Sequence, residues 1–246
     1  MLLSGLITAY FIRHGQAGIR QDYDRLSDLG RQQSIRLGAW LARRPVLFEA
    51  ACSGRLKRQR ETADLVRDEY RQTGVNFPEL ATDPCWDEFD LDAVYRGIAP
   101  QIASRDEEFR RRLEELEQQA RNIASPVHHT WTRCDTTVVR AWIDGFHEYE
   151  GESFEAFVKR VRGASDILSS ANAPCNVAIF TSATPAAIWT AAALDLDGHK
   201  IMQLAGVTYN TAVTVIRIDG KMDEKRIRLL QFNTVPHLEP ELLTYR

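Results

Sequence analysis

The sequence predicts an α/β fold with a mostly parallel sheet covered by helices and a largely helical segment inserted into it. Short apolar runs alternate with helical patterns towards both ends of the 246-residue chain, whereas residues 89–150 break that alternation. A chain of this length fits one large domain with an insertion. We therefore expect a single domain over residues 1–246, with a cap inserted at residues 89–150.

The first half of the chain follows the order strand, helix, strand, helix. Residues 7–12 are an apolar run, and after a polar loop Ser27 can cap a helix that Pro45 would end. A second apolar run at residues 46–52 leads through a Ser-Gly turn into a helical pattern over residues 56–70. Strands that alternate with helices are typical of a parallel sheet.

The pattern changes between residues 77 and 150. A turn-rich stretch with three prolines gives way to a charged amphipathic helix predicted over residues 104–123. A polar helix with apolar anchors would suit a cap over a crevice. It fits equally well a structural subdomain with no part in catalysis.

The alternation resumes after this segment. Residues 151–169 are predicted to form a helix, and residues 176–181 a buried strand followed by a helix that is apolar on nearly every side. Residues 207–218 and 226–232 have the alternation of strands, and a turn at residues 219–220 would make them an antiparallel hairpin.

Composition excludes several classes of partner. The net charge is −3, from 31 basic and 34 acidic residues, so nucleic acid or an acidic membrane finds no overall attraction. No segment approaches the ~18 apolar residues of a spanning helix, and the apolar start has no preceding basic residue, so it makes a poor signal peptide. The four cysteines are scattered without metal or redox spacing. We expect a cytoplasmic protein with reduced thiols.

The residues at the ends of the first two strands suggest a phosphate site. Arg13, His14, Gly15 and Gln16 follow the first strand. By themselves they fit a surface histidine as well as a phosphate site. Arg58 follows the second strand early in a helix, and the carboxyl ends of parallel strands share one crevice, so Arg13 and Arg58 can converge.

Motifs spread over nearly the whole chain resemble those of the histidine phosphatase superfamily, also called phosphoglycerate mutase-like. They are Arg13-His14-Gly15, Leu26-Ser27-x-x-Gly30-x-x-Gln33, Ser53-x-x-Leu56-x-Arg58-x-x-x-Thr62-Ala63, Glu88-x-Asp90, Gly151-Glu152-Ser153, Thr208-x-Asn210-x-Ala212-Val213-Thr214 and Phe232-Asn233-x-x-x-His237-Leu238. The resemblance implies a three-layer α/β/α sandwich around a mostly parallel sheet.

The resemblance also implies catalytic roles. His14 would be the nucleophile that becomes a phosphohistidine, with Arg13 and Arg58 as phosphate clamps and Gln16 as a further amide donor. Glu88 would protonate the leaving alcohol. Asp87 is the neighbour that an error of one position would select. Because arginines and an imidazole supply the charge, neither a metal nor another cofactor is expected.

The sequence departs from the family after the fourth strand, where Ser182 occupies the position of a second histidine that binds the phosphoryl group. A serine can donate one hydrogen bond but carries no charge near neutral pH. Three alternatives follow. The hydroxyl serves with the helix amino terminus at Thr184-Pro185 as a weaker phosphate donor, a cap histidine such as His128 or His129 fills the gap, or catalysis is lost and phosphate binding remains.

The predicted function is therefore a phosphomonoesterase that hydrolyses a small phosphorylated substrate through a phosphohistidine, with activity that Ser182 could reduce. Phosphoglycerate mutase-type transfer and a catalytically impaired phospholigand-binding or interaction module are the alternatives. The cap would select the substrate, and nothing in one sequence identifies it.

Overall fold

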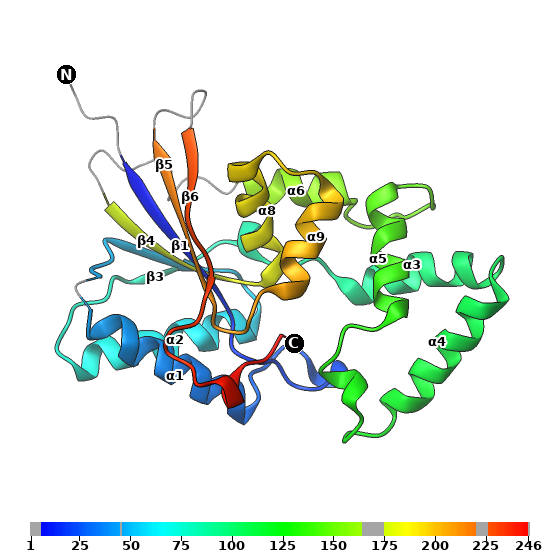
Figure 1. Cartoon of the computed structure of the whole chain (residues 1–246), viewed down its shortest axis with the longest axis horizontal. Coiled ribbons are helices and arrows are strands. Elements are labelled where there is room, and N and C mark those ends of the chain that lie inside the picture. Colours follow the sequence, from blue (N-terminus) through cyan, green and yellow to red (C-terminus); the bar gives the residue numbers. More distant parts are fainter. Residues whose placement is uncertain (1–5, 45, 164–174, 220–225, 246) are drawn as a thin grey trace.

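A six-stranded mixed sheet forms the centre of the protein. The computed structural model describes residues 6–44, 46–163, 175–219 and 226–245. The strands are β1 Ile7–Arg13, β2 Ala50–Ser53, β3 Leu80–Thr82, β4 Cys175–Thr181, β5 Val213–Asp219 and β6 Arg226–Thr234. They lie in the order β3-β2-β4-β1-β5-β6 (Figure 1). The first four in this order are mutually parallel, while β5 and β6 run antiparallel at one edge.

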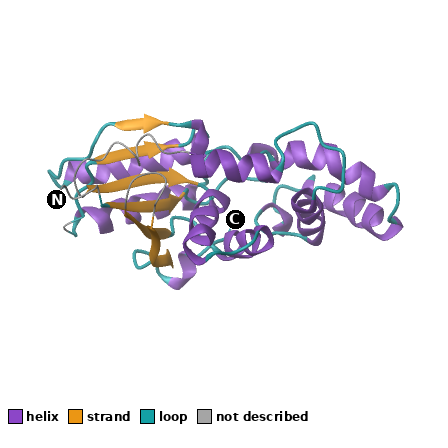
Figure 2. Ribbon diagram, turned by 90° about the horizontal axis from the view of Figure 1, so that it is seen from above, coloured by secondary structure: helices purple, strands orange, loops and turns teal. Residues whose placement is uncertain are grey.

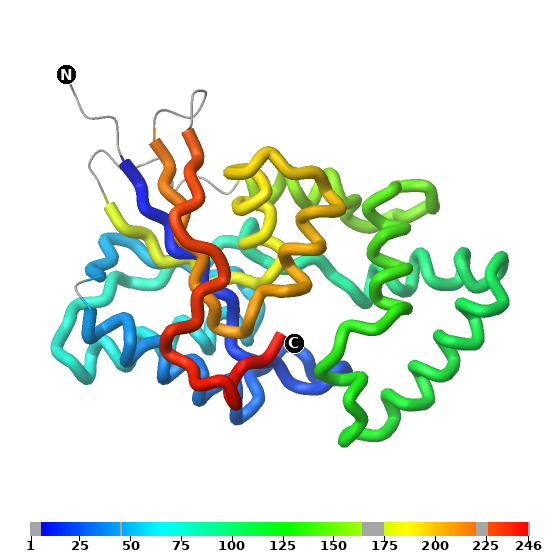
Figure 3. Tube along the Cα trace, in the orientation of Figure 1, coloured from blue at the N-terminus to red at the C-terminus, as the bar shows by residue number. Residues whose placement is uncertain are grey.

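Helices cover both faces of the sheet and create three layers. The covering helices are α1 (Asp28–Ala42), α2 (Lys57–Gln72), α6 (Phe154–Gly163), α8 (Ala183–Leu194) and α9 (Gly198–Val207). Helices α1 and α2 share one face, and α6, α8 and α9 lie on the other (Figures 1 and 3). Successive strand residues point to opposite faces, so Phe11 packs in the core beneath α8 and Ile12 in the core beneath α1 and α2. The predicted three-layer α/β/α sandwich is confirmed.

Three further helices extend to one side of the sheet. They are α3 (Leu91–Ala103), α4 (Glu107–Ala120) and α5 (Arg133–Asp144). Figure 2 shows helices without strands on the side of the molecule away from the amino terminus. Phe89 stacks on Trp142 of α5 with ring centroids 4.6 Å apart, and Trp142 meets Phe154 of α6 edge to face. This aromatic cluster joins the extension to the core.

Several predicted boundaries were wrong. Val207 ends α9 instead of opening a strand, and β5 begins only at Val213. Helix α9 went unpredicted because it buries only Ile201 and Ala205, which gives too weak an apolar period. Strand β3 and helix α3 fall in the stretch predicted to be turn-rich, and α3 contains Pro100 in its interior.

Some sequence predictions concern positions outside the described residues. These are Pro45, the end of the helix predicted to Ser169 and the turn at Gly220. Among the described helices, none is long and apolar enough to cross a membrane.

Candidate active site

Four predicted site residues meet at the carboxyl edge of the parallel strands. His14 directly follows β1, Arg58 lies in the first turn of α2 after β2, Glu88 follows the short turn after β3, and Ser182 follows β4. Because β1, β2 and β4 are adjacent and parallel, their carboxyl ends open onto the same crevice. The topology therefore gathers residues that lie up to 168 positions apart in the chain.

The backbone around His14 is fixed by its neighbours. The amide of His14 donates to Thr181 O at 2.9 Å, and the amide of Gly15 donates to Thr62 Oγ1 at 3.0 Å. A Cβ on Gly15 would lie 2.3 Å from the carbonyl oxygen of Gly30, so only glycine permits this close approach to α1. Gln33 accepts from the amide of Gln16 at 2.9 Å. The loop is thus preorganised before any ligand binds.

The His14 imidazole presents Nε2 towards Arg58. Nδ1 lies 2.7 Å from the carbonyl oxygen of Gly15, which can only accept, so Nδ1 carries the hydrogen. Nε2 then has the free electron pair, and it accepts from Arg58 Nε at 3.1 Å. Burial, followed by the charges of Arg58 and Arg13, holds the pKa of His14 well below its usual range. The ring is therefore neutral at pH 7, as a nucleophile must be.

Arg13 and Arg58 are both buried beside this ring. Arg13 is 5% exposed, its Nη1 donates to Thr208 O, and its Nε has no hydrogen-bond partner in the described part of the chain. Arg58 Nη1 donates to Asp24 Oδ1 at 3.0 Å, and its guanidinium lies 4.9 Å from the centre of the Tyr23 ring. A buried guanidinium with an unsatisfied N–H is suited to an anion.

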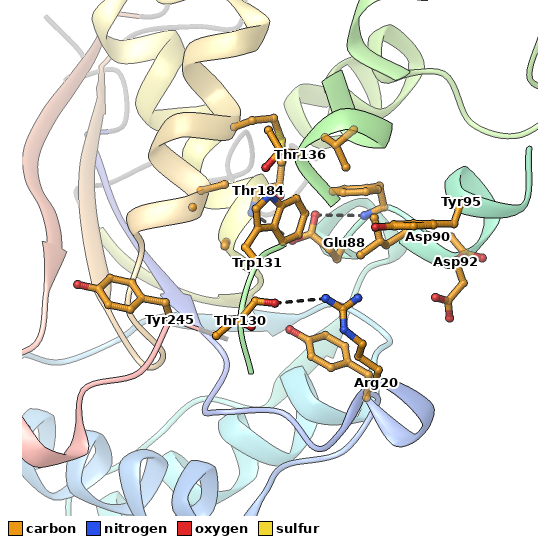
Figure 4. Close-up of a pocket in the computed structure, with 18 of the residues that line it drawn as sticks. Arg20, Glu88, Asp90, Asp92, Tyr95, Thr130, Trp131, Thr136, Thr184 and Tyr245 are labelled. Carbon is orange, nitrogen blue, oxygen red and sulfur yellow. Dashed lines mark hydrogen bonds between the residues drawn. The ribbon is translucent and has the colours of Figure 1, made fainter. Parts of the chain in front are cut away.

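The Glu88 carboxyl lies at the amino end of α8. Its Oε2 accepts from the amide of Thr184 at 3.1 Å, and its Oε1 accepts from the amide of Phe89 at 3.2 Å (Figure 4). Burial raises the pKa of Glu88, while the Thr184 hydrogen bonds and the charge of Arg58 act in the opposite direction. A carboxyl with a raised pKa is suited to donating a proton.

Asp87 has a different role from its neighbour. Its Oδ1 accepts from the amide of Arg55 at 2.5 Å, and its Oδ2 pairs with Arg55 Nε at 2.8 Å. These contacts fix the turn between β2 and α2. Arg55, Lys57 and Arg60 are exposed, as expected for a solvated helix end.

Ser182 is buried and already hydrogen-bonded. It is 1% exposed, and its Oγ accepts from Gln59 Nε2 at 2.9 Å. It is the residue before α8 but makes no side-chain cap for that helix. Its hydroxyl hydrogen points away from Gln59, because Oγ is the acceptor in this pair.

The other candidate polar groups lie in different surroundings. Gln16 Oε1 accepts from Ser27 Oγ at 2.8 Å, which ties that side chain to the cap of α1. His128 is fully buried: Nδ1 accepts from the amide of Arg20 at 3.3 Å, and Nε2 contacts Asn122 O at 2.9 Å. His129 lines the cleft described below.

Arg13, Arg58 and Glu88 line a cleft of about 1500 Å³ between the core and the helices α3, α4 and α5. Sequence reasoning missed several residues of this region. Tyr23 and Asp24 contact Arg58, and nothing local in the sequence distinguishes them. No group of three or more His, Cys, Asp or Glu side chains placed to hold a metal occurs within the described ranges.

The model of the histidine phosphatase superfamily (branch 1) matches residues 9–141 and 135–233. The chain belongs to the histidine phosphatase superfamily. His14, Arg13, Arg58 and Glu88, which the sequence predicted as site residues, fall within the matched ranges and lie at the carboxyl edge of the sheet. A comparison with curated proteins gave no match.

Solved structures agree on the fold of this histidine phosphatase superfamily member. A mycobacterial glucosyl-3-phosphoglycerate phosphatase has 19% identity and a TM-score of 0.57, with 93% of this chain and 99% of that chain covered. Phosphoglycerate mutase from Bacillus anthracis has 17% identity and a TM-score of 0.58, covering 95% and 96%. Phosphoserine phosphatase from Entamoeba histolytica has 14% identity and a TM-score of 0.55, covering 95% and 100%.

Proposed function

We propose that the protein is a phosphomonoesterase that works through a phosphohistidine on Nε2 of His14. The observation that carries the proposal is the hydrogen-bond pattern of this ring. Nδ1–H is engaged by Gly15 O, so the free electron pair lies on Nε2, next to Arg58, which lines the same cleft as Glu88. A buried, neutral imidazole beside two arginines suits attack on a phosphate monoester.

In the first step His14 Nε2 attacks phosphorus, and the bond between phosphorus and the leaving oxygen breaks. Glu88 gives its proton to that oxygen, so the alcohol leaves neutral. Arg13 and Arg58 neutralise the phosphoryl oxygens, and Arg58 Nε–H transfers its hydrogen bond from His14 to one of them. In the second step water attacks phosphorus, Glu88 takes a proton from that water, and the bond to Nε2 breaks to release inorganic phosphate.

Ser182 supplies a weaker substitute for the family's second histidine in this proposal. Its hydroxyl accepts from Gln59 and retains a hydrogen to donate to a phosphoryl oxygen, but it adds no charge. Removing one preorganised donor from an enzyme site costs roughly 10²–10³ in rate, so a reduced turnover is expected. Gln16 is the weaker of the proposed phosphate ligands, because its Oε1 is occupied by Ser27.

Ser182 also motivates a second candidate function. Without the second histidine the site could bind a phosphorylated ligand and not turn it over. Residues 89–150 would then still act as the cap that selects the ligand in a single domain.

The test compares the protein with His14→Ala on a panel of aryl and alkyl phosphates in EDTA, with His147→Ala as the matched histidine control outside the cleft. We expect metal-independent release of inorganic phosphate that His14→Ala abolishes and His147→Ala retains. Acid-labile, base-stable labelling by a radioactive phosphate donor should require His14. Binding without turnover or label would instead support the phospholigand module, and stoichiometric phosphoryl return in a coupled 3-phosphoglycerate assay would support a mutase.

A further inference from the structure

The cleft is much larger than a phosphate requires. Its volume of about 1500 Å³ exceeds the ~300–1000 Å³ typical of small-molecule sites. The proposed phosphate ligands Arg13 and Arg58 come from the core, whereas most of the other lining residues belong to α3, α4, α5 and α9. The greater part of the space is therefore available to the alcohol part of a substrate.

The wall of this space away from His14 is mainly apolar. Leu113 and Leu116 of α4, Ile143 of α5 and Met202 of α9 line it, and all four are only partly buried. Trp131, in the loop before α5, is 45% exposed, and Figure 4 shows its indole projecting into the middle of the pocket. An exposed aromatic ring inside a concave apolar wall is suited to a ligand that stacks on it.

The charged residues of the cleft offer little to a second anion. Arg20 pairs with Asp135 at 2.7 Å and Arg55 with Asp87 at 2.8 Å. His199 lies 3.0 Å from an Asp144 oxygen.

The cleft also carries carboxylates of its own. Asp90, Asp92 and Glu117 are exposed along it. Two exposed cations also line the cleft: Arg96 lies 4.0 Å from Asp90, and Arg140 of α5 has no ion-pair partner among the described residues. A ligand with a second phosphate or carboxylate would therefore meet mostly neutralised or negative surroundings.

We propose that the substrate is a phosphate monoester of a large, largely apolar alcohol that carries an aromatic ring and no second anionic group. This inference rests on the proposed phosphatase function for the position of the phosphate. The ring stacks on Trp131, and the apolar part lies against α4, α5 and α9. The carboxylates of the cleft disfavour phosphoglycerates, bisphosphates and nucleoside polyphosphates.

The experiment compares kcat/KM for phenyl, 2-naphthyl and 4-carboxyphenyl phosphate, whose leaving groups have similar basicity. The second ring buries additional apolar area, so the naphthyl ester should be preferred over phenyl by about tenfold, mainly through KM. The carboxylate ester should be poorer than phenyl. Trp131→Ala should bring the naphthyl-to-phenyl ratio close to one, and Trp131→Phe should restore part of it.

Phe146→Ala is the matched control, because Phe146 is 88% exposed and does not line the cleft. It should leave the ratio unchanged. A preference for phenyl or 4-carboxyphenyl phosphate, or a ratio that Trp131→Ala does not alter, overturns the proposal. A carboxylate preference that Arg140→Gln removes would identify a bis-anionic substrate in its place.

Binding separates this inference from the proposed function. Calorimetric titration of the same esters into His14→Ala measures the preference without turnover. Naphthyl phosphate that binds about tenfold more tightly than phenyl phosphate supports the substrate class even if the protein hydrolyses neither ester. Equal affinities overturn the substrate class even if both esters are hydrolysed.

Discussion

Replacing Glu88 by glutamine tests the proton donor most directly. Glutamine keeps the length of the side chain and one carbonyl oxygen, so the hydrogen bond from the Thr184 amide can persist. It cannot give a proton to the leaving oxygen. General acid catalysis typically contributes about 10²- to 10⁴-fold, and a loss in that range is expected for an alkyl phosphate, whose alkoxide must be protonated.

The leaving group provides an internal comparison. 4-Nitrophenolate leaves without a proton, so Glu88→Gln should lower kcat/KM for 4-nitrophenyl phosphate, which reports the first step alone, by less than about tenfold. The assay is steady-state kinetics on both esters with each protein. A substitution that merely loosened the site would reduce both rates to the same extent.

The pH profile gives a second, independent measure. Burial raises the pKa of Glu88, and the acid acts only while protonated. Activity on the alkyl ester should therefore be present below the pKa of Glu88 in the folded protein and fall as pH rises through that pKa. The pH profile of Glu88→Gln should lack this fall in activity, which is the alkaline limb of the profile.

Asp87→Asn is the control for position, because the Asp87 carboxylate is engaged by Arg55. It should preserve both the limb and the dependence on the leaving group. Equal losses of kcat/KM on the two esters in Glu88→Gln, or an unchanged fall in activity at alkaline pH, would refute the assignment of Glu88 as proton donor.

Three further substitutions test the framework of the site. Asp135 is fully buried and accepts from Arg20 and Tyr95. Asp135→Asn should therefore lower the unfolding free energy measured in urea titrations by about 3–5 kcal/mol. A loss under about 1 kcal/mol would contradict a stabilising role of the Arg20–Asp135 pair. Burial lowers the pKa of His237 to about 4, and the unfolded chain takes up its proton near pH 6.5, so this group should remove about 2 kcal/mol of stability between pH 7 and pH 5. Between pH 7 and pH 5 the unfolding free energy of His237→Gln should fall less than that of the unmodified protein, by that amount. Gly15→Ala should abolish release of phosphate, since a Cβ there would meet Gly30 O. Gly163→Ala, whose Cβ would meet nothing within 4 Å and which lies outside the cleft, should not.

The sequence correctly placed Arg13 and Arg58 at the carboxyl edge of the sheet, because residues that follow parallel strands share that edge. Apolar runs followed by Arg13-His14 and by Arg58 place both arginines at the carboxyl ends of β1 and β2, which are parallel and flank β4, and that edge is where they lie. Helix α9 was missed because its few buried positions leave the apolar period weak.

The contacts that complete the site could not be predicted from the sequence. Arg20 and Asp135 are 115 positions apart, and each resembles an ordinary surface charge in the sequence. Their pairing ties the loop after β1 to the start of α5, together with the contact of Arg20 Nε with Val127 O at 2.7 Å. Such pairs depend on how the extension docks on the core, which no local pattern encodes.

The structure adds contacts of Ser182 that the sequence could not show. The sequence predicted only that Ser182 occupies the position of a second histidine of the family. In the fold it belongs to a buried polar group, because Gln59 Nε2 donates both to Ser182 Oγ at 2.9 Å and to Trp86 O at 3.1 Å. A Cβ at position 54 would lie 2.0 Å from Gln59 Oε1, so Gly54 leaves the space that the Gln59 side chain occupies.

A histidine at position 182 would therefore have to displace Gln59, and the serine is fitted to its surroundings. Ser182→His alone should lower stability and fail to raise turnover, because the larger ring crowds the buried Gln59 amide and removes one of its two hydrogen bonds. Ser182→His combined with Gln59→Ala provides space for the ring and should recover activity relative to the single variant. Turnover that rises in Ser182→His alone would show that Gln59 does not define this pocket.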